Sequence, residues 1–211
     1  MKIQYFGHSC FALRYEGGPV LITDPFDASV TYAPCTEACD AALVSHDHFD
    51  HNHTATLSGA FETIRTAGEH CVKGAKITAI PSFHDPEGGA LRGNNLLMRV
   101  ECEGLSIAHL GDLGHMPNDA QLAALKDLDI LMLPIGGTYT IDTPQAEALI
   151  AQLKPRRVIA MHFKTEAYPT INIATCDAFA RDMNAAILPR EIEVTKENID
   201  TLPEIMILNY K

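Results

Sequence analysis

The sequence has no apolar run that approaches the roughly 20 residues a helix needs to cross a membrane. Positive charge is also scarce: 16 lysines and arginines face 27 aspartates and glutamates, which leaves a formal net charge of −11. Proteins that bind nucleic acid more usually present a basic face. These two shortages argue against a membrane-spanning protein and against a nucleic-acid-binding protein.

Cysteine spacing offers no framework for disulfides or for structural zinc. The six cysteines are scattered, and Cys35 and Cys39 form the one close pair, with no second pair beside them. We therefore expect reduced thiols. The N-terminus reads directly into a strand, with no charged segment followed by an apolar one, so we expect a cytoplasmic protein.

The chain of 211 residues is long enough for one well-filled core. Strands are expected at 3–6, 10–15, 20–23, 41–44, 62–65, 70–73, 75–80, 96–101, 105–109, 129–133, 158–160, 191–195 and 205–209. Helical segments are expected at 52–60, from a capping box at Asn118 to 127, from Thr143 onward, and at 173–184. Residues 28–40 and the Gly-rich 86–95 should be loops.

The strands fall into two batches, each followed by helices. Two sheets packed face to face with helices outside would bury both batches. This pattern predicts an α/β fold, a four-layer α/β/β/α sandwich. With no linker or low-complexity segment in the chain, we expect one domain over residues 1–211.

The most informative stretch runs from Ser45 to His51. It places His46, His48, Asp50 and His51 in one short loop after a buried strand. Imidazole and carboxylate groups hold divalent cations such as zinc. Neighbours in so tight a loop point in different directions, so two adjacent cations could share the four groups more easily than one. A solvated loop that binds nothing is the alternative, and this spacing disfavours it.

Three further candidate ligands each follow a separate predicted strand. They are His84, Asp112 and His162. Any one of them alone would more often be a hydrogen-bonded core histidine or a turn aspartate. With the four residues of the opening loop they form a set of seven.

These motifs resemble those of metallo-β-lactamase superfamily hydrolases, over most of the chain. The resemblance rests first on His-x-His-x-Asp-His at 46–51. A closer likeness, to L-ascorbate-6-phosphate lactonase-like and N-acyl-phosphatidylethanolamine phospholipase D-like proteins, rests on Gly7-His8, Thr23-Asp24-Pro25, Ser82-Phe83-His84, Gly111-Asp112, Leu133-Pro134-Ile135-Gly136-Gly137 and Met161-His162-Phe163. The resemblance also implies the four-layer sandwich.

Carried over by motif, the resemblance implies two metal sites. His46, His48 and His84 would hold the first cation; Asp50, His51 and His162 would hold the second; and Asp112 would bridge them. Two divalent ions are expected, most simply zinc, with manganese or iron as alternatives. A hydroxide shared by the pair would be the nucleophile. Asp50 and Asp112 are the predicted catalytic carboxylates.

Substrate contacts are predicted at His8, Arg92 and Tyr139, with Arg92 favoured because a guanidinium suits phosphate or carboxylate. Asp24 is expected to orient ligands or to cap a turn. Histidine at 48 favours hydrolysis over redox chemistry, and Asn52-His53 after His51 disfavours a glyoxalase II-like thioesterase.

The leading hypothesis is a hydrolase for a lactone, amide or phosphodiester in a small, anionic molecule. A metal-binding protein without catalysis and a nuclease of the same superfamily are the alternatives. We expect a small-molecule substrate, no nucleic acid and no membrane partner, and leave a homo-oligomer open.

Overall fold

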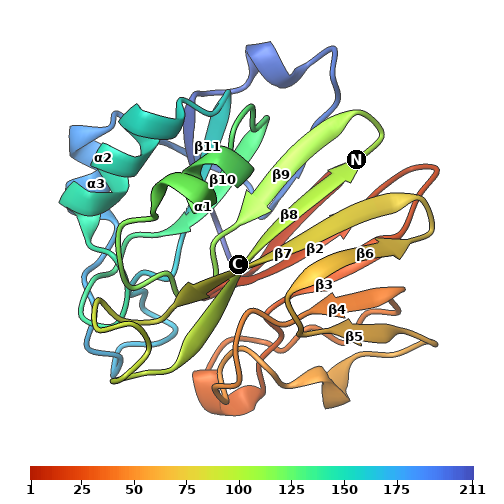
Figure 1. The fold of residues 1–211 in the computed structure, drawn as a ribbon, viewed down its shortest axis with the longest axis horizontal. Coiled ribbons are helices and arrows are strands. Elements are labelled where there is room, and N and C mark those ends of the chain that lie inside the picture. The colour runs from red at the N-terminus through yellow and green to blue at the C-terminus, as the bar shows by residue number, and fades with distance from the viewer.

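The computed structural model describes residues 1–211 and contains two β-sheets (Figure 1). The six-stranded sheet has the order β13-β1-β2-β3-β4-β5, formed by β1 (Lys2–Gly7), β2 (Cys10–Arg14), β3 (Val20–Thr23), β4 (Ala41–Leu43), β5 (Glu62–Ile64) and β13 (Glu191–Glu193). The eight-stranded sheet has the order β12-β14-β11-β10-β9-β8-β7-β6, formed by β6 (Gly68–Val72), β7 (Ala75–Phe83), β8 (Asn94–Cys102), β9 (Leu105–His109), β10 (Ile130–Pro134), β11 (Arg157–Met161), β12 (Ala186–Leu188) and β14 (Ile205–Leu208). The predicted α/β fold with two sheets is confirmed.

The core lies between the sheets because side chains alternate across each strand. In β2, Phe11 and Leu13 join the main hydrophobic cluster of 47 residues, which draws from both sheets. Cys10 and Ala12 of the same strand face the other way, into a separate cluster of 11 residues. Phe11 stacks on Tyr5 with ring centroids 4.7 Å apart. Truncating a fully buried phenylalanine such as Phe11 to alanine costs about 3–5 kcal/mol.

The three α-helices gather on the outer side of the eight-stranded sheet, near β10 and β11 (Figure 1). They are α1 (Asp119–Ala124), α2 (Thr143–Leu153) and α3 (Asp177–Asp182). The predicted capping box of Asn118 and Gln121 is present at the start of α1. In α2 the cap is Asp142, one residue before the predicted start, and Pro144 lies in the first turn.

The outer side of the six-stranded sheet is covered differently. Phe26, Val30, Tyr32 and Leu57 pack there against the outward residues of β1 to β4. They belong to irregular chain around the 3₁₀ turns η1 (Ala28–Val30) and η2 (Thr54–Thr56); a third turn, η3 (Ile199–Thr201), precedes β14. The outermost layer on this side is therefore loop and 3₁₀ turn. The helical segment expected at 52–60 is reduced to η2.

Strand ends also differ from the sequence-based expectation. β7 continues through Pro81 to Phe83, and β8 begins at Asn94, so the loop between them is shorter. Pro81 lies opposite Leu96, whose N–H points away from β7 to the oxygen of Ser45. The pair is therefore a non-hydrogen-bonded one, and the missing N–H of Pro81 breaks no ladder bond.

The helix expected at 173–184 is shorter and consists of α3 alone. The short strand β12 that follows α3 was not predicted. Three residues carry too little pattern to identify such a strand. None of the helices is long and apolar enough to cross a membrane.

Candidate functional site

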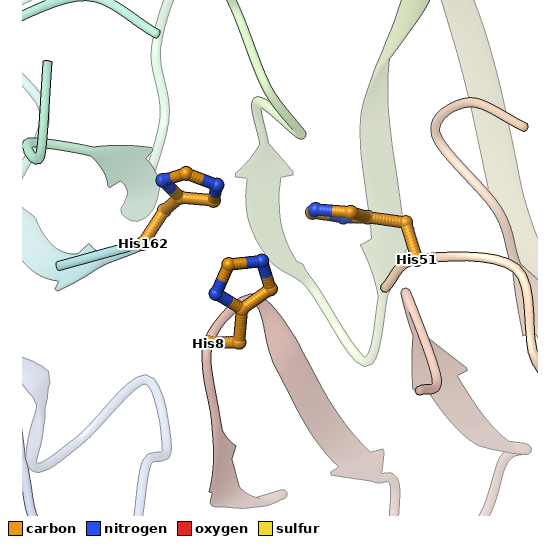
Figure 2. A group of neighbouring side chains, drawn as sticks. All are labelled: His8, His51 and His162. Carbon is orange, nitrogen blue, oxygen red and sulfur yellow. The ribbon is translucent and has the colours of Figure 1, made fainter. Parts of the chain in front are cut away.

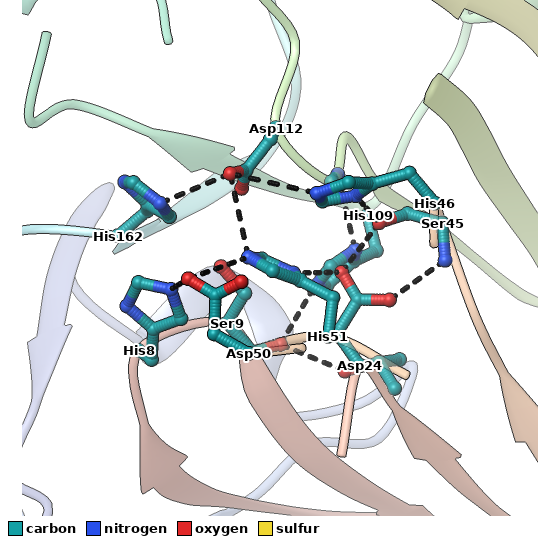
Figure 3. Close-up of polar contacts among 12 residues, drawn as sticks. His8, Ser9, Asp24, Ser45, His46, Asp50, His51, His109, Asp112 and His162 are labelled. Carbon is teal, nitrogen blue, oxygen red and sulfur yellow. Dashed lines mark hydrogen bonds and ion pairs between the residues drawn. The ribbon is translucent and has the colours of Figure 1, made fainter. Parts of the chain in front are cut away.

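The seven predicted ligands come together although four parts of the chain supply them. Figure 3 shows His46, Asp50, His51, Asp112 and His162 among them. The loop after β4 contributes His46, His48, Asp50 and His51, while His84, Asp112 and His162 follow β7, β9 and β11. Asp112 lies at the centre and is buried. Its Oδ2 is 3.1 Å from Nε2 of His84, 3.1 Å from Nε2 of His162, 3.3 Å from Nε2 of His51 and 3.9 Å from Nε2 of His46. One carboxylate oxygen thus faces four imidazoles.

Three groups of side chains could each hold a metal ion, and two of them consist of histidines only. The third combines Asp24 with His46 and His51 and so shares its histidines with the other two. In the first, one nitrogen from each of His46, His48 and His84 lies within 4.8 Å of the others, as the sequence predicts. The second group contains His51 and His162, also as predicted, but its third member is His8 (Figure 2). The prediction had Asp50 in that position.

Asp50 nevertheless lies next to this second group. Its Oδ2 is 3.2 Å from Nε2 of His8 and 3.9 Å from Nε2 of His51. The prediction had His8 contacting substrate, yet only 1 % of this residue is exposed. Its ring packs against that of His162, with centroids 4.3 Å apart, and its carbonyl accepts the backbone N–H of His162 at 2.8 Å. His8 therefore lies behind Asp50.

Asp24 orients two of the candidate ligands from beneath. Its Oδ2 accepts the Nδ1–H of His51 at 2.9 Å and the hydroxyl of Ser45 at 2.7 Å. Since Ser45 uses its one proton on this carboxylate, its oxygen accepts the Nδ1–H of His46 at 2.9 Å. Both histidines then carry a proton on Nδ1 and direct Nε2 into the site, which is the atom that would bind a cation.

Backbone groups position two further candidate ligands, His84 and His162. Nδ1 of His84 donates to the carbonyl of Tyr139 at 3.0 Å, which leaves its Nε2 free for the site in the same way. His162 has a left-handed backbone conformation at φ 51°. Gly136 passes so close that a Cβ there would lie 2.3 Å from the carbonyl oxygen of His162. A side chain at 136 would displace His162.

Burial sets the protonation of the cluster. It lowers the pKa of His46 to about 3, with the neighbouring His51 adding to the effect. Burial, assisted by His162, lowers the pKa of His8 to about 4. Burial alone would raise the pKa of Asp112, but His162 and His51 hold it well below its usual range. His51 is the exception: burial would lower its pKa, but Asp112 and Asp24 raise it well above the usual value, so a cation that binds at its Nε2 would displace a proton.

Several of the candidate metal ligands have a buried atom without a hydrogen-bond partner. Nε2 of His46, Nε2 of His51 and Oδ1 of Asp112 are buried and unpaired. An unsatisfied buried polar group costs about 1–3 kcal/mol. Three such atoms converging on one place fit a cation as the missing partner, and the mixture of imidazole and carboxylate suits zinc.

A pocket of about 500 Å³ opens over the cluster. Its floor is formed by candidate ligands, among them Asp50 and Asp112. Arg92 and Tyr139, two of the three predicted substrate contacts, line it, while His8 does not. Its far wall, Tyr168 and residues 170–172, was not predicted because this loop carries no motif.

The other histidines lie outside the cluster. Nε2 of His109 donates to the carbonyl of Ser9 at 2.8 Å, next to Asp24. His53, His70 and His115 contact Asp27, the carbonyl of Thr66 and the backbone N–H of Phe83 respectively.

Two supporting residues were missed. Asn95 is buried behind Asp112, and Asp85 is buried within the loop that carries Arg92. The position of Asp85 directly after His84 was its one signal.

Comparison with known proteins gives a consistent result. A family model described as a beta-lactamase superfamily domain matches residues 2–162. A UPF0173 metal-dependent hydrolase of Alkaliphilus metalliredigens is 29% identical, over 81% of this chain and 88% of its own. A Thermotoga maritima protein, assigned as a Zn-dependent hydrolase of the metallo-β-lactamase superfamily, is 32% identical with a TM-score of 0.82, over 98% of this chain and 97% of its own.

The metallo hydrolase Igni18 of Ignicoccus hospitalis shares the fold, with a TM-score of 0.65 and 23% identity over 87% of this chain and 90% of its own. The likeness to the lactonase-like and phospholipase D-like branch stays a prediction. The family model covers most of the chain and the Thermotoga maritima structure nearly all of it, so this protein belongs to the metallo-β-lactamase superfamily.

Proposed function

We propose that this protein is a hydrolase with a binuclear metal site that cleaves a lactone, amide or phosphodiester bond in a small, anionic molecule. The observation that carries the proposal is the position of Asp112, whose Oδ2 lies within 3.9 Å of four histidine Nε2 atoms. A carboxylate between two histidine groups can bridge two cations. The relatives named as metal-dependent hydrolases support the same activity.

His46, His48 and His84 would hold one cation; His51 and His162, with Asp50 or His8, would hold the other; and Asp112 would contact both. Zinc suits this set best, with manganese or iron as alternatives. When bound, such a pair of cations lowers the pKa of a water molecule and polarises the oxygen of the bond to be cleaved.

The protein's own groups would complete the chemistry. Asp50 lines the pocket, and His8 holds its Oδ2 at 3.2 Å, so this carboxylate is placed to orient the attacking water. Asp112 would fix the separation of the two histidine groups. Arg92 and Tyr139, on the rim, would contact the substrate.

The size of the pocket supports a small-molecule substrate. About 500 Å³ is in the usual range for such sites. The net charge of −11 disfavours a nuclease, because a polyanion would be repelled. We propose the cytoplasm as its compartment. A metal-binding protein without catalysis is the competing hypothesis, and the next experiment separates the two.

The test is a substrate screen on protein reconstituted with zinc, manganese or iron. Lactones, amides and bis(4-nitrophenyl) phosphate are compared for wild type, for Asp112→Asn and for the exposed control Asp119→Asn. We expect metal-dependent turnover that falls about 100-fold or more in Asp112→Asn, since a bound metal supplies several kcal/mol. Full activity in that variant would overturn the site. Saturating metal with no turnover would favour the non-catalytic hypothesis.

A further inference from the structure

The loop between β7 and β8 is built around one buried carboxylate. None of Asp85 is exposed. Its Oδ1 accepts the backbone N–H groups of Glu87 at 2.8 Å and Gly89 at 2.9 Å, and its Oδ2 accepts those of Leu91 at 3.0 Å and Arg92 at 2.7 Å. Burial would raise the pKa of Asp85, but these four donors, led by Arg92, lower it. The loop is thus closed around a fixed anion.

This organisation fixes the backbone of Arg92. Residues 86–91 are mostly exposed and include Gly88 and Gly89, both with positive φ. Besides the bonds to Asp85, the loop has backbone hydrogen bonds from Ala90 to Glu87 and from Gly93 to Gly89. Arg92 is itself one of the four donors to Asp85. The carboxylate of Asp85 therefore determines where the side chain of Arg92 begins.

The side chain of Arg92 reaches the rim of the pocket and is left largely unpaired. Its guanidinium lies over the ring of Tyr139, 5.6 Å from the centroid, and donates one hydrogen bond to the carbonyl of Thr138 at 3.2 Å. A guanidinium has five N–H donors, so four stay available.

Most other arginines of the protein form an ion pair, so the unpaired guanidinium of Arg92 is unusual. Six of the eight arginines pair with a carboxylate: Arg14, Arg65, Arg99, Arg156, Arg157 and Arg181. Arg190 lies over the ring of Phe6 and donates to the carbonyl of Tyr5. Arg92 has no acidic partner, although the protein carries an excess of acidic residues.

Arg92 also occupies a junction. It lines the pocket above Asp112, where it is the only arginine or lysine. It also lines a second cavity of about 540 Å³, which His48 separates from the first. The other arginine of that cavity, Arg65, is paired with Asp47 at 2.6 Å. A negative group between the two cavities would therefore meet one free guanidinium.

We propose that Arg92 is a specificity-determining residue, which binds a carboxylate or phosphate that the substrate carries away from the bond to be cleaved. Asp85 is its positioning residue. The substrate class is then a small organic molecule with a labile bond at the metal end and an anionic group at the other. This inference rests on the proposed hydrolase function for the labile bond, but the anion site is testable without turnover.

The first measurement is binding to the zinc-loaded protein by calorimetry. Glutarate and butyrate have similar chain lengths, and only glutarate has a second carboxylate to reach Arg92. We expect glutarate to bind about 10–100-fold more tightly than butyrate, the range for hydrogen bonds to charged groups. Arg92→Gln and Asp85→Asn should bring this ratio toward one, and Arg92→Lys should recover part of it. Arg65→Gln is the matched control and should keep the ratio.

The second measurement compares hydrolysis of γ-valerolactone with that of the same ring carrying a carboxylate in place of the methyl group. The ratio of kcat/KM for the two lactones should fall in Arg92→Gln and Asp85→Asn. A merely structural defect would lower both rates and leave the ratio unchanged, which would overturn the positioning role. If the protein shows no turnover but prefers glutarate in a way that depends on Arg92, the hydrolase function is refuted and the anion site stands. Turnover with Arg92-independent selectivity would refute the anion site alone.

Discussion

The side-chain amide of Asn95 holds Asp112 in place from behind the site. Its Oδ1 accepts the backbone N–H of Asp112 at 3.0 Å. Its Nδ2 donates to Ser82 Oγ at 2.8 Å and to the carbonyl of Leu110 at 2.9 Å. One buried amide thus joins the start of β8, the end of β7 and the segment that carries the central carboxylate. The position of Asp112 therefore depends on a residue whose side chain hydrogen-bonds to no histidine.

Replacing Asn95 by alanine should destabilise the protein and weaken the site together. The variant leaves the N–H of Asp112 and the carbonyl of Leu110 buried without partners, and we expect a loss of about 2–4 kcal/mol in the free energy of unfolding. Urea unfolding and the metal content of the purified protein are the measurements. Asn94→Ala is the control, since Asn94 is the exposed neighbour on the same strand. Equal effects of both variants would contradict the role of Asn95.

Replacing Asp24 by asparagine should weaken metal binding without disturbing the backbone. Asp24 has φ 39°, in a region that asparagine tolerates well, so the chain can keep its path. An amide can accept at one atom only, which disrupts the arrangement that orients His51 and His46 through Ser45. We expect about 10–100-fold weaker metal binding, as for other groups that orient ligands.

Competition with a chelator of known affinity measures the change for Asp24→Asn. The exposed Asp177→Asn variant should match wild type. Unchanged affinity in Asp24→Asn would mean that the orienting hydrogen bonds are dispensable.

Adding metal to chelator-treated protein should raise its melting temperature. Buried, unpaired donors at His46, His51 and Asp112 gain their missing partner when a cation binds. A ligand at 1,000 times its Kd stabilises the native state by about 4 kcal/mol, which corresponds to about 8–16 °C in a chain of this length. Calorimetric scans with and without zinc are the measurement. The shift should shrink in His84→Ala and persist in His70→Ala, which alters a histidine outside the cluster. A shift of equal size in both variants would place the metal elsewhere.

Truncating Phe49 should impair substrate binding more than stability. This side chain lines the pocket although 59 % of it is exposed, so the folded state gains little from it. We expect Phe49→Ala to change the free energy of unfolding by no more than about 0.5 kcal/mol. KM should rise because an apolar wall of the pocket is lost. Leu91→Ala is the control, since Leu91 is 66 % exposed and lies outside the pocket lining. A KM equal to that of wild type would remove Phe49 from the substrate site.

Local pattern was sufficient for much of the architecture and for naming the candidate ligands. Alternating and buried runs predicted most of the strands, because side-chain direction in a strand repeats every two residues. The capping box at Asn118 and the spacing from His46 to His51 are equally local. Each can be recognised within a few residues of sequence.

Only the tertiary structure decided which of these groups meet. His8 lies against Asp50 and His162, and Asn95 supports Asp112, across sequence separations that no local pattern spans. The loop cover on the six-stranded sheet and the short strand β12 depend in the same way on packing against distant segments. The sequence by itself therefore determined the donor types and the strands that deliver them. The folded chain decided their grouping, their protonation and the unpaired state of Arg92, because burial and hydrogen-bond partners are properties of contacts between remote residues.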